Sequence, residues 1–551
     1  MMRRSPILAL IAIGALLATA PAAAQVRLDR ADPTIAEQAL PAPRTAPDNS
    51  SAATLVAPVQ PSAGTRAPLP TPRAILVVGN SAIATEVFAP ALVPFLGRDL
   101  SGDDLARLAG AVSAVAREAG YPFATATIEP QSTADGVLRV TVDEGRIAAV
   151  RVIGANNPLA DRLLTDALVT DMPVRRKTLE RAILLVGDVA GVTVKDSRFV
   201  RQNGFNILLV TIEQDPASAY VQLDNRGSKE IGPLRATLLG SARGVVQAGD
   251  ELRMVAAITP IEPSEFGFLR ATYAVPIDLH GSMLAVSASA GRARPGGFLK
   301  PLDVIGDSVD VAIAYTTPLA RSRARSMWAG VELRALRTDQ TLLGGRLRDD
   351  RLATLTASLN GTARTGGGVL NGAVTMVVGL PVDGVTHEGD RLTSRADGDA
   401  RFVTWGYTAD WTVGLTGPFA LTLASAGQLA SRPLLATAEI GVGGPVFGRA
   451  YDYAERTGDE GILGSAELRA NLGHVPGAIE RILLYGFIDG GYVDNLRNGI
   501  GGGSLLSTGT GARLGNGALD GMIEIAFPLN EDRFDTGSRQ PRISFRLARS
   551  F

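Results

Sequence analysis

ISFRLARSF, residues 543–551, is the stretch that decides the fold. Ile543, Phe545 and Leu547 stand at every second position, with polar or small residues between them. A two-residue period indicates a β-strand whose two faces meet different surroundings. In an outer-membrane β-barrel these surroundings are lipid and lumen, and the sheet closes because lipid offers no partner to an open edge. A final aromatic after this period is typical of a closing barrel strand, so Phe551 is the candidate barrel-insertion signal.

The same alternation recurs upstream, from about residue 217 onward. It is clear at 252–258, 309–315, 329–335 and 353–359. About 335 residues at roughly 20 per strand and turn predict about 16 strands. A soluble β-sandwich or a propeller is the alternative, but no blade-like repeat signature is visible. An aromatic content of 5% is low for an aromatic girdle.

Composition limits the remaining classes. The chain has 551 residues, a net charge of −1 and no cysteine. The absence of cysteine excludes a disulfide scaffold, thiolate zinc sites and cysteine nucleophiles. The balanced charge does not favour nucleic acid as a partner. After the first residues, no apolar run reaches the roughly 18 residues that a membrane-spanning helix needs. Any membrane crossing therefore has to use strands.

The N-terminal segment reads as an export signal followed by a linker. A basic start, an apolar run at 7–17 and small residues at 22–24 indicate a signal peptide over residues 1–24. Residues 25–72 are rich in proline and alanine, which favours a flexible linker. A short N-terminal helix near 33–40 is the alternative for part of it.

Two small α+β modules are expected between this linker and the barrel. Over residues 73–146 the pattern gives a strand, a helical region, a helix that Ser101 caps, and two more strands. The order recurs over residues 147–215, with an apolar helix face at 179–186 and a closing strand at 207–212. A period of about 70 residues used twice indicates an internal repeat.

Three motifs near the C-terminus carry a resemblance. GGPVFGRAY at 443–451, FIDGG at 487–491 and GTGAR at 509–513 follow one another in order. They are similar to the GG-x3-VRG[YF], F-x-D-x-G and G-x-G-x-R motifs of the two-partner secretion transporters (TpsB proteins). These are the haemolysin secretion/activation proteins of the POTRA–β-barrel superfamily. In this chain Gly448 stands where the family has valine, and Ala450 where it has glycine.

The resemblance implies a mainly β fold, in which a transmembrane antiparallel barrel of about 16 strands spans residues 216–551. Two POTRA modules precede it, and a loop at about 430–461 folds into the lumen. It also implies that Arg449 pairs with Asp489 on the inner wall, since a guanidinium can fork two hydrogen bonds onto one carboxylate. If position 450 requires a positive φ, Ala450 carries strain. The implied loop-anchor or gating residues are Gly443, Gly444, Arg449, Tyr451 and Asp489, and the implied barrel-motif residues are Phe487, Gly491, Gly511 and Arg513.

Landmarks of the first POTRA module are similar as well. They are Gly120, Tyr121, Gln131 and the stretch 142–145. POTRA modules bind unfolded polypeptide partly through a free strand edge and its main-chain hydrogen bonds. A role as a spacer is the alternative for these modules.

Catalytic and cofactor-binding patterns are missing from the sequence. His280, His387 and His474 lie far apart, and no H-E-x-x-H, G-x-S-x-G or P-loop pattern occurs. We therefore expect no enzyme activity, no metal site and no cofactor.

The function that the resemblance implies is an outer-membrane pore of a Gram-negative bacterium, with its POTRA modules in the periplasm. It would recognise an unfolded exoprotein and translocate it to the surface without ATP. The implied partners are a large secreted exoprotein, such as a β-helical adhesin or cytolysin, the barrel assembly machinery and outer-membrane lipids; nucleic acid is not among them. An outer-membrane insertase of the same superfamily is the alternative, and a passive porin would not need the periplasmic repeats.

Overall fold

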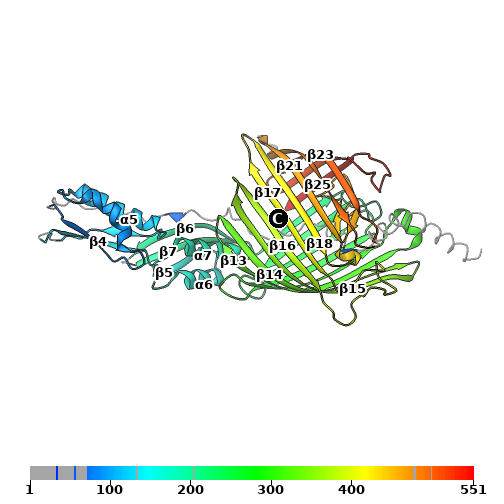
Figure 1. The fold of residues 1–551 in the computed structure, drawn as a ribbon, viewed down its shortest axis with the longest axis horizontal. Helices are drawn as coiled ribbons and strands as arrows, with labels where there is room; N and C mark the ends of the chain where they lie inside the picture. Colours follow the sequence, from blue (N-terminus) through cyan, green and yellow to red (C-terminus); the bar gives the residue numbers. More distant parts are fainter. Residues whose placement is uncertain are drawn as a thin grey trace, which may run out of the picture.

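Two α+β units and a large β-barrel follow one another along the long axis of the molecule (Figure 1). The expected signal peptide, residues 1–24, and most of the expected linker lie outside the residues that the computed structural model describes. The structure describes residues 33–34, 55–56, 71–131, 135–202, 205–475, 479–497 and 499–551.

The first unit packs a helix on a three-stranded sheet. Its elements are β2 (Ala74–Val78), η2 (Thr85–Phe88), α4 (Ala89–Leu92), η3 (Val93–Phe95), α5 (Gly102–Glu118), β3 (Thr125–Thr127) and β4 (Val137–Asp143). The sheet order is β2-β4-β3, with β2 parallel to β4. Ser101 and Asp104 form a capping box at the start of α5, which satisfies N–H groups that the helix itself leaves free. Leu105, Leu108 and Val112 bury the apolar face of this helix against the sheet.

The second unit repeats this order, and the sequence analysis missed one of its strands. It contains β5 (Ala149–Gly154), α6 (Pro158–Leu168), α7 (Arg176–Asp188), β6 (Val192–Gln202) and β7 (Phe205–Gln214). β6 was not predicted, because a bulge between Val194 and Asp196 interrupts its alternation. The sheet order is β1-β6-β7-β5, in which β1 (Leu55–Val56) pairs in parallel with β6. No helix among the described residues is long and apolar enough to cross a membrane.

The barrel closes with 16 strands, as the spacing predicted. Each strand pairs antiparallel with its neighbour in the barrel, and the first strand pairs with the last. Its strands are β8 (Ala217–Asp224), β9 (Arg235–Arg243), β10 (Glu251–Ile258), β11 (Phe266–Pro276), β12 (Met283–Ala293), β13 (Ile305–Arg321), β14 (Arg325–Leu342), β15 (Gly345–Thr365), β16 (Gly368–Gly379), β17 (Val403–Gly414), β18 (Phe419–Ala430), β21 (Glu460–Val475), β22 (Ile479–Asp494), β23 (Gly503–Asn516), β24 (Leu519–Pro528) and β25 (Arg542–Ser550). Short 3-10 helices lie in two connections, η4 (Gly297–Leu302) and η5 (Ala436–Ala438).

The two faces of the barrel wall differ as the alternation predicted. On β13, Val309 and Val311 are 58% and 52% exposed, whereas Asp310 between them is 3% exposed. On β25, Ile543 is 61% exposed and Ser544 only 1%. Apolar side chains therefore form the outer surface that lipid covers, and polar side chains line the lumen.

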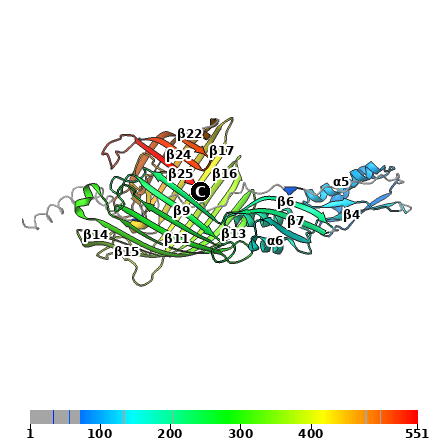
Figure 2. The same ribbon diagram turned by 180° about the vertical axis from the view of Figure 1, so that it is seen from behind.

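The second unit docks directly on one mouth of the barrel. Arg321, at the end of β13, forms two hydrogen bonds of 2.6 and 2.8 Å with Asp188, the last residue of α7. Glu180 of α7 accepts a hydrogen bond from the backbone N–H of Arg323 in the β13–β14 turn. Both α+β units extend from this mouth (Figures 1 and 2), which is the periplasmic one if they are the POTRA modules that the resemblance implies. Successive strands run in opposite directions, so their connections alternate between the two mouths. The connections 380–402, 431–459 and 495–502 therefore lie at the opposite, extracellular mouth.

Candidate functional site

The connection between β18 and β21, residues 431–459, folds back into the barrel; we call it the inward loop. Two short strands, β19 (Ile440–Val442) and β20 (Arg456–Gly458), pair antiparallel and form its stem. The segment 443–455 between them is its tip. Val442, Ala450 and Tyr451 are buried against residues of the barrel wall.

Two consecutive glycines turn the chain at the tip. Gly443 and Gly444 have φ values of +113° and +104°, a region that side chains disfavour. A Cβ atom on Gly443 would lie 2.2 Å from the carbonyl oxygen of Asp452, and one on Gly444 would lie 2.7 Å from the ring of Tyr453. Both positions therefore require glycine in this arrangement.

Asp489 on β22 receives the tip. Its Oδ2 lies 2.9 Å from Nε of Arg449 in an ion pair. Its Oδ1 accepts hydrogen bonds from the backbone N–H groups of Gly448 and Arg449, at 3.0 and 3.2 Å, and from the hydroxyl of Ser507 on β23. Asp489 thus holds both the side chain and the backbone of the tip, and its side chain is fully buried.

Two further carboxylates share the guanidinium of Arg449. Nη1 of Arg449 lies 2.7 Å from Glu467 on β21 and 3.4 Å from Glu524 on β24. Glu467 also pairs with Arg469 and Arg513, while Glu524 pairs with Arg226 and accepts a hydrogen bond from Tyr485. Four guanidiniums and three carboxylates, counting Asp489, therefore form one network, in which burial is offset by many charged hydrogen bonds.

Aromatic rings and glycines form the floor of this site. The guanidinium of Arg449 lies 4.1 Å from the ring centre of Phe487, and that of Arg513 lies 4.2 Å from the ring centre of Tyr485. On the neighbouring strand, Gly509 pairs with Phe487 and Gly511 with Tyr485. A Cβ atom on Gly511 would lie 2.4 Å from the Tyr485 hydroxyl. The two glycines therefore leave room for rings that lie flat on the wall and face the cations.

Tyr451 connects the tip to further parts of the barrel. Its side chain is 1% exposed. Its hydroxyl lies 3.2 Å from the side chain of Asn530 and 3.3 Å from the carbonyl oxygen of Leu506. These residues belong to the β24–β25 connection and to β23, so the tip touches several strands at once.

The two departures from the family motif have different consequences. Ala450 has no positive φ, so the condition under which it would carry strain is not met. Gly448 has a φ of +82°, and a Cβ atom there would lie 3.1 Å from the Cα of Gly443. A valine at this position would therefore be strained, and the tip is shaped around glycine at 448.

The remaining residues of the motifs lie near the site or at the seam. Gly491 lies where a Cβ atom would be 2.4 Å from the side chain of Leu463 on the next strand. Phe551 lies at the seam of the barrel, where β25 pairs with β8. Its N–H donates to the carbonyl oxygen of Ala219 at 2.8 Å. The sequence analysis assigned no role to Glu467, Glu524 or Ser507, since only the strand register brings these residues to the tip.

A cavity of about 1050 Å³ lies between the inward loop and the barrel wall. Charged residues of the barrel wall line it, among them Asp224, Arg235 and Asp410, and the inward loop contributes Glu439 and Arg449. Among the described residues, no group of three or more histidines and carboxylates could hold a metal ion. The site is an ion-paired support for a loop inside a polar lumen.

The landmark Glu144 has a structural role in the first unit. Its carboxylate accepts hydrogen bonds from the hydroxyl and N–H of Ser81 and from the N–H groups of Ala82 and Ile83, at 2.6 to 3.0 Å. Burial acts to raise the pKa of Glu144, but these hydrogen bonds outweigh it, so the pKa lies below its usual value of 4.5. Glu144 thus fastens the turn after β2.

A 16-stranded barrel with an ion-paired inward loop, preceded by POTRA-type units, defines an outer-membrane transporter of the POTRA–barrel class. The family model described as haemolysin secretion/activation protein ShlB/FhaC/HecB matches residues 204–514. The model of the ShlB-type POTRA domain matches residues 71–145. The chain belongs to the haemolysin secretion/activation protein family.

Individual relatives agree with this placement. The heme/hemopexin transporter protein HuxB of Haemophilus influenzae strain 86-028NP is 22% identical over 405 residues, which cover 72% of this chain and 71% of that protein. The outer membrane transporter CdiB of Escherichia coli is 24% identical over 191 residues, 34% of this chain and 32% of that protein.

Solved structures share the fold. CdiB from Escherichia coli has a TM-score of 0.71 at 18% identity, covering 90% of this chain and 93% of that one. CdiB from Acinetobacter baumannii has a TM-score of 0.63 at 16% identity and covers all of both chains. BamA from Haemophilus ducreyi lacking POTRA domains 1–3 has a TM-score of 0.54 at 11% identity, covering 88% of this chain and all of that one.

Proposed function

We propose that this transporter is the pore of a two-partner secretion system. It recognises one unfolded exoprotein in the periplasm through its POTRA units and moves it to the cell surface without ATP. The observation that carries this proposal is the inward loop, whose tip is held in the lumen by Arg449 on Asp489. Ion pairs and hydrogen bonds can release without any covalent change, so such a tip can leave its place and let a chain pass.

Recognition would use the free strand edges of the α+β units. The first sheet has β2 and β3 at its edges, and the second has β5 at one edge, while β1 covers β6 at the other. An extended polypeptide can add to such an edge through main-chain hydrogen bonds, which hold many sequences. The contact between Asp188 and Arg321 supports this proposal, because it holds the second unit against one mouth of the barrel.

The energy for transport would come from the exoprotein itself. A chain that folds after it leaves the extracellular mouth cannot slide back, because refolding at the surface shifts the equilibrium outward. A large β-helical adhesin or cytolysin suits this route, since each folded turn adds to the bias. The barrel assembly machinery is the expected partner for insertion of the pore, with Phe551 as the insertion signal.

An insertase for other barrel proteins is the second candidate function. It is favoured by the pairing of β8 with β25, which joins only Tyr220–Asp224 to Arg546–Ser550 and is the shortest between barrel neighbours. A short seam opens more easily than a long one, and an open seam could template new strands. The fold likeness to BamA is compatible with this candidate.

A deletion strain separates the two candidates. We would delete the gene, restore it on a plasmid, and measure the protein content of both the culture medium and the outer membrane. Loss of one large protein from the medium, with an unchanged outer membrane, supports the secretion pore. Unchanged medium with depleted barrel proteins would reject it in favour of the insertase.

A further inference from the structure

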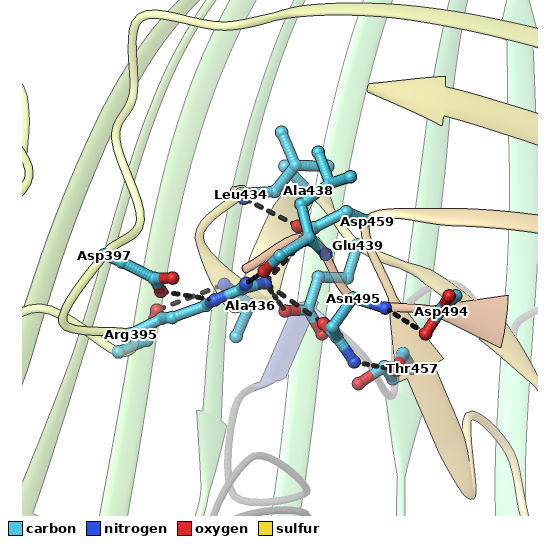
Figure 3. A network of polar contacts seen from close by, with 12 residues as sticks. Arg395, Asp397, Leu434, Ala436, Ala438, Glu439, Thr457, Asp459, Asp494 and Asn495 are labelled. Atoms are coloured by element: carbon cyan, nitrogen blue, oxygen red, sulfur yellow. Dashed lines mark hydrogen bonds and ion pairs between the residues drawn. The ribbon is translucent and has the colours of Figure 1, made fainter. Parts of the chain in front are cut away.

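A second buried ion-pair cluster lies at the extracellular mouth, away from the tip of the inward loop. Its centre is Arg395, in the connection 380–402 between β16 and β17, and Asp459, the last residue of the inward loop (Figure 3). The two side chains are 5% and 0% exposed, and their closest atoms are 2.7 Å apart. We call this cluster the neck clasp.

Asp459 ties the two ends of the inward loop together. Its Oδ1 accepts a hydrogen bond of 2.7 Å from the backbone N–H of Leu434, where the loop enters the barrel. Its Oδ2 accepts one of 2.8 Å from the N–H of Leu496, in the connection after β22. One carboxylate therefore joins the entry of the loop, its exit and a neighbouring surface connection.

Arg395 binds the inward loop and the connection after β22 from the opposite side. Besides Asp459, its guanidinium lies 2.7 Å from Asp397 in its own connection, 3.4 Å from Glu439 in the loop and 3.0 Å from the amide oxygen of Asn495. It also donates to the carbonyl oxygen of Leu496. These contacts use the fixed planar fork of arginine, which lysine cannot reproduce.

Neighbouring residues also pack closely around the neck clasp. A Cβ atom on Gly499 would lie 2.4 Å from the guanidinium of Arg395, so a larger residue there would have to displace this guanidinium. The hydroxyl of Ser394 accepts a hydrogen bond of 3.1 Å from the N–H of Ala436. Leu434 and Leu435 are fully buried beneath the connection 380–402. The neck of the loop is therefore held on every side by elements of the extracellular mouth.

We propose that Arg395 is a positioning residue. Through Asp459 it fixes the neck of the inward loop, where the loop enters and leaves the barrel, and thereby directs the tip to Asp489. Its role in the transport pore rests on the proposed function. The stem strands β19 and β20 run directly from this neck to the tip. A neck held in one place limits the positions that Arg449 can sample, which raises the effective concentration of the tip at its site. The neck clasp stays closed while the tip binds and releases.

The first test measures tip docking in the full-length protein. Ala450 is fully buried in the docked tip, and the natural chain has no cysteine, so Ala450→Cys gives a single reporter thiol. We would measure its labelling rate in Arg395→Ala, Arg449→Ala and the double variant, with exposed Arg391→Ala as the control in the same connection. Arg395→Ala should raise the rate about tenfold, a modest figure for the loss of several charged hydrogen bonds. Arg391→Ala should leave it unchanged.

The double variant tests the coupling. If Arg395 acts by aiming the tip, Arg395→Ala adds little once Arg449→Ala has already released it. Independent, multiplicative effects of the two substitutions on the labelling rate would overturn the proposal. An unchanged labelling rate in Arg395→Ala would overturn it as well.

A cross-link distinguishes aiming from general stabilisation. Cysteines at Ser394 and Ala436, joined by a short cross-linker, replace the clasp by a covalent bond. In planar bilayers, Arg395→Ala should show more frequent openings than the wild-type protein. The cross-link should restore the resting conductance of Arg395→Ala, whereas it should not restore the resting conductance of Arg449→Ala. When Arg395 and Arg449 are both retained, the cross-linked protein should still secrete its partner. A cross-link that blocks secretion would overturn the claim that the clasp stays closed.

These readouts separate this inference from the proposed function. Labelling and conductance need no exoprotein, so they test the clasp even if the protein content of the medium rejects the secretion pore. Conversely, a secretion defect in the deletion strain, together with unchanged gating in Arg395→Ala, would retain the pore and reject the clasp. Should Arg395→Ala fail to insert, Arg395→Lys keeps the charge without the fork and is expected to give a smaller rise in labelling.

Discussion

Removing the guanidinium of Arg449 should release the tip of the inward loop while leaving the barrel intact. In Arg449→Ala the loop loses its ion pairs with Asp489 and Glu467, at 2.9 and 2.7 Å. It also loses the contact of the guanidinium with the ring of Phe487. None of these groups contributes to the main-chain pairing of the barrel strands, so insertion and closure should be unaffected.

The structure sets the size of the effect. Orphaning one partner of a buried ion pair costs about 3–5 kcal/mol. Here the carboxylates keep other partners: Asp489 retains Ser507, Glu467 retains Arg469 and Arg513. We therefore expect about 3 kcal/mol, which lowers the ratio of docked to undocked tip by roughly 150-fold. Asp489→Ala should cost more, because it also leaves two backbone N–H groups and a buried hydroxyl without their acceptor.

The assay combines thiol labelling of Ala450→Cys with heat-modifiability of the barrel and secretion of the partner. Arg481→Ala is the matched control, since Arg481 lies on the same strand as Asp489 in a 2.7 Å surface ion pair with Asp520 and is 60% exposed. Such pairs contribute about 0–1 kcal/mol. A folded Arg449→Ala barrel with wild-type labelling and wild-type export would refute the anchor role.

Three further results are expected. Gly443→Ala should release the tip as strongly as Arg449→Ala, because its Cβ would lie 2.2 Å from a carbonyl oxygen, whereas Ala450→Gly, at a residue without positive φ, should change docking by less than about 1 kcal/mol; an equal frequency of openings of both variants in planar bilayers would contradict this. Glu144→Gln should destabilise the first α+β unit by about 1–3 kcal/mol at pH 7. Since the folded pKa of Glu144 lies below 4.5, its contribution is complete above that pH and is lost as the pH falls through the depressed pKa, so hydrogen exchange should show a difference that vanishes in acid; a difference that does not change with pH would count against it. Arg321→Ala should leave Asp188 partly buried and without this partner. It should lower the free energy of opening of α7, measured by hydrogen exchange, by about 3 kcal/mol. Unchanged exchange would mean that other contacts hold this helix.

The barrel could be predicted because lipid and lumen impose opposite preferences on successive residues. Val309 and Asp310 show the rule in one pair, one exposed to lipid and the other buried in the lumen. This information is local to each strand, and its recurrence over many strands is what indicates a barrel. β6 was missed because Lys195, Asp196 and Arg198 interrupt its apolar positions and a bulge shifts its register.

The site could be predicted only where a motif carried it. Arg449 and Asp489 came from the resemblance, and the structure places them in one ion pair. Glu524 and Arg395 stand in no recognisable motif, and their partners lie 75 and 64 residues away. Strand register brings Glu524 to Arg449, whereas the folding of two connections brings Arg395 to Asp459, and the residue pattern of a single strand or connection encodes neither contact.

The contacts of the loop tip also bear on the order of assembly. Its partners on β21, β22 and β24 lie 18, 40 and 75 residues further along the chain, whereas the seam between β8 and β25 joins residues about 320 apart. Short loops close faster than long ones, because they lose less chain entropy. The C-terminal strands and the tip can therefore fold as one local unit, so that the anchor is already formed when the last hydrogen bonds complete the cylinder.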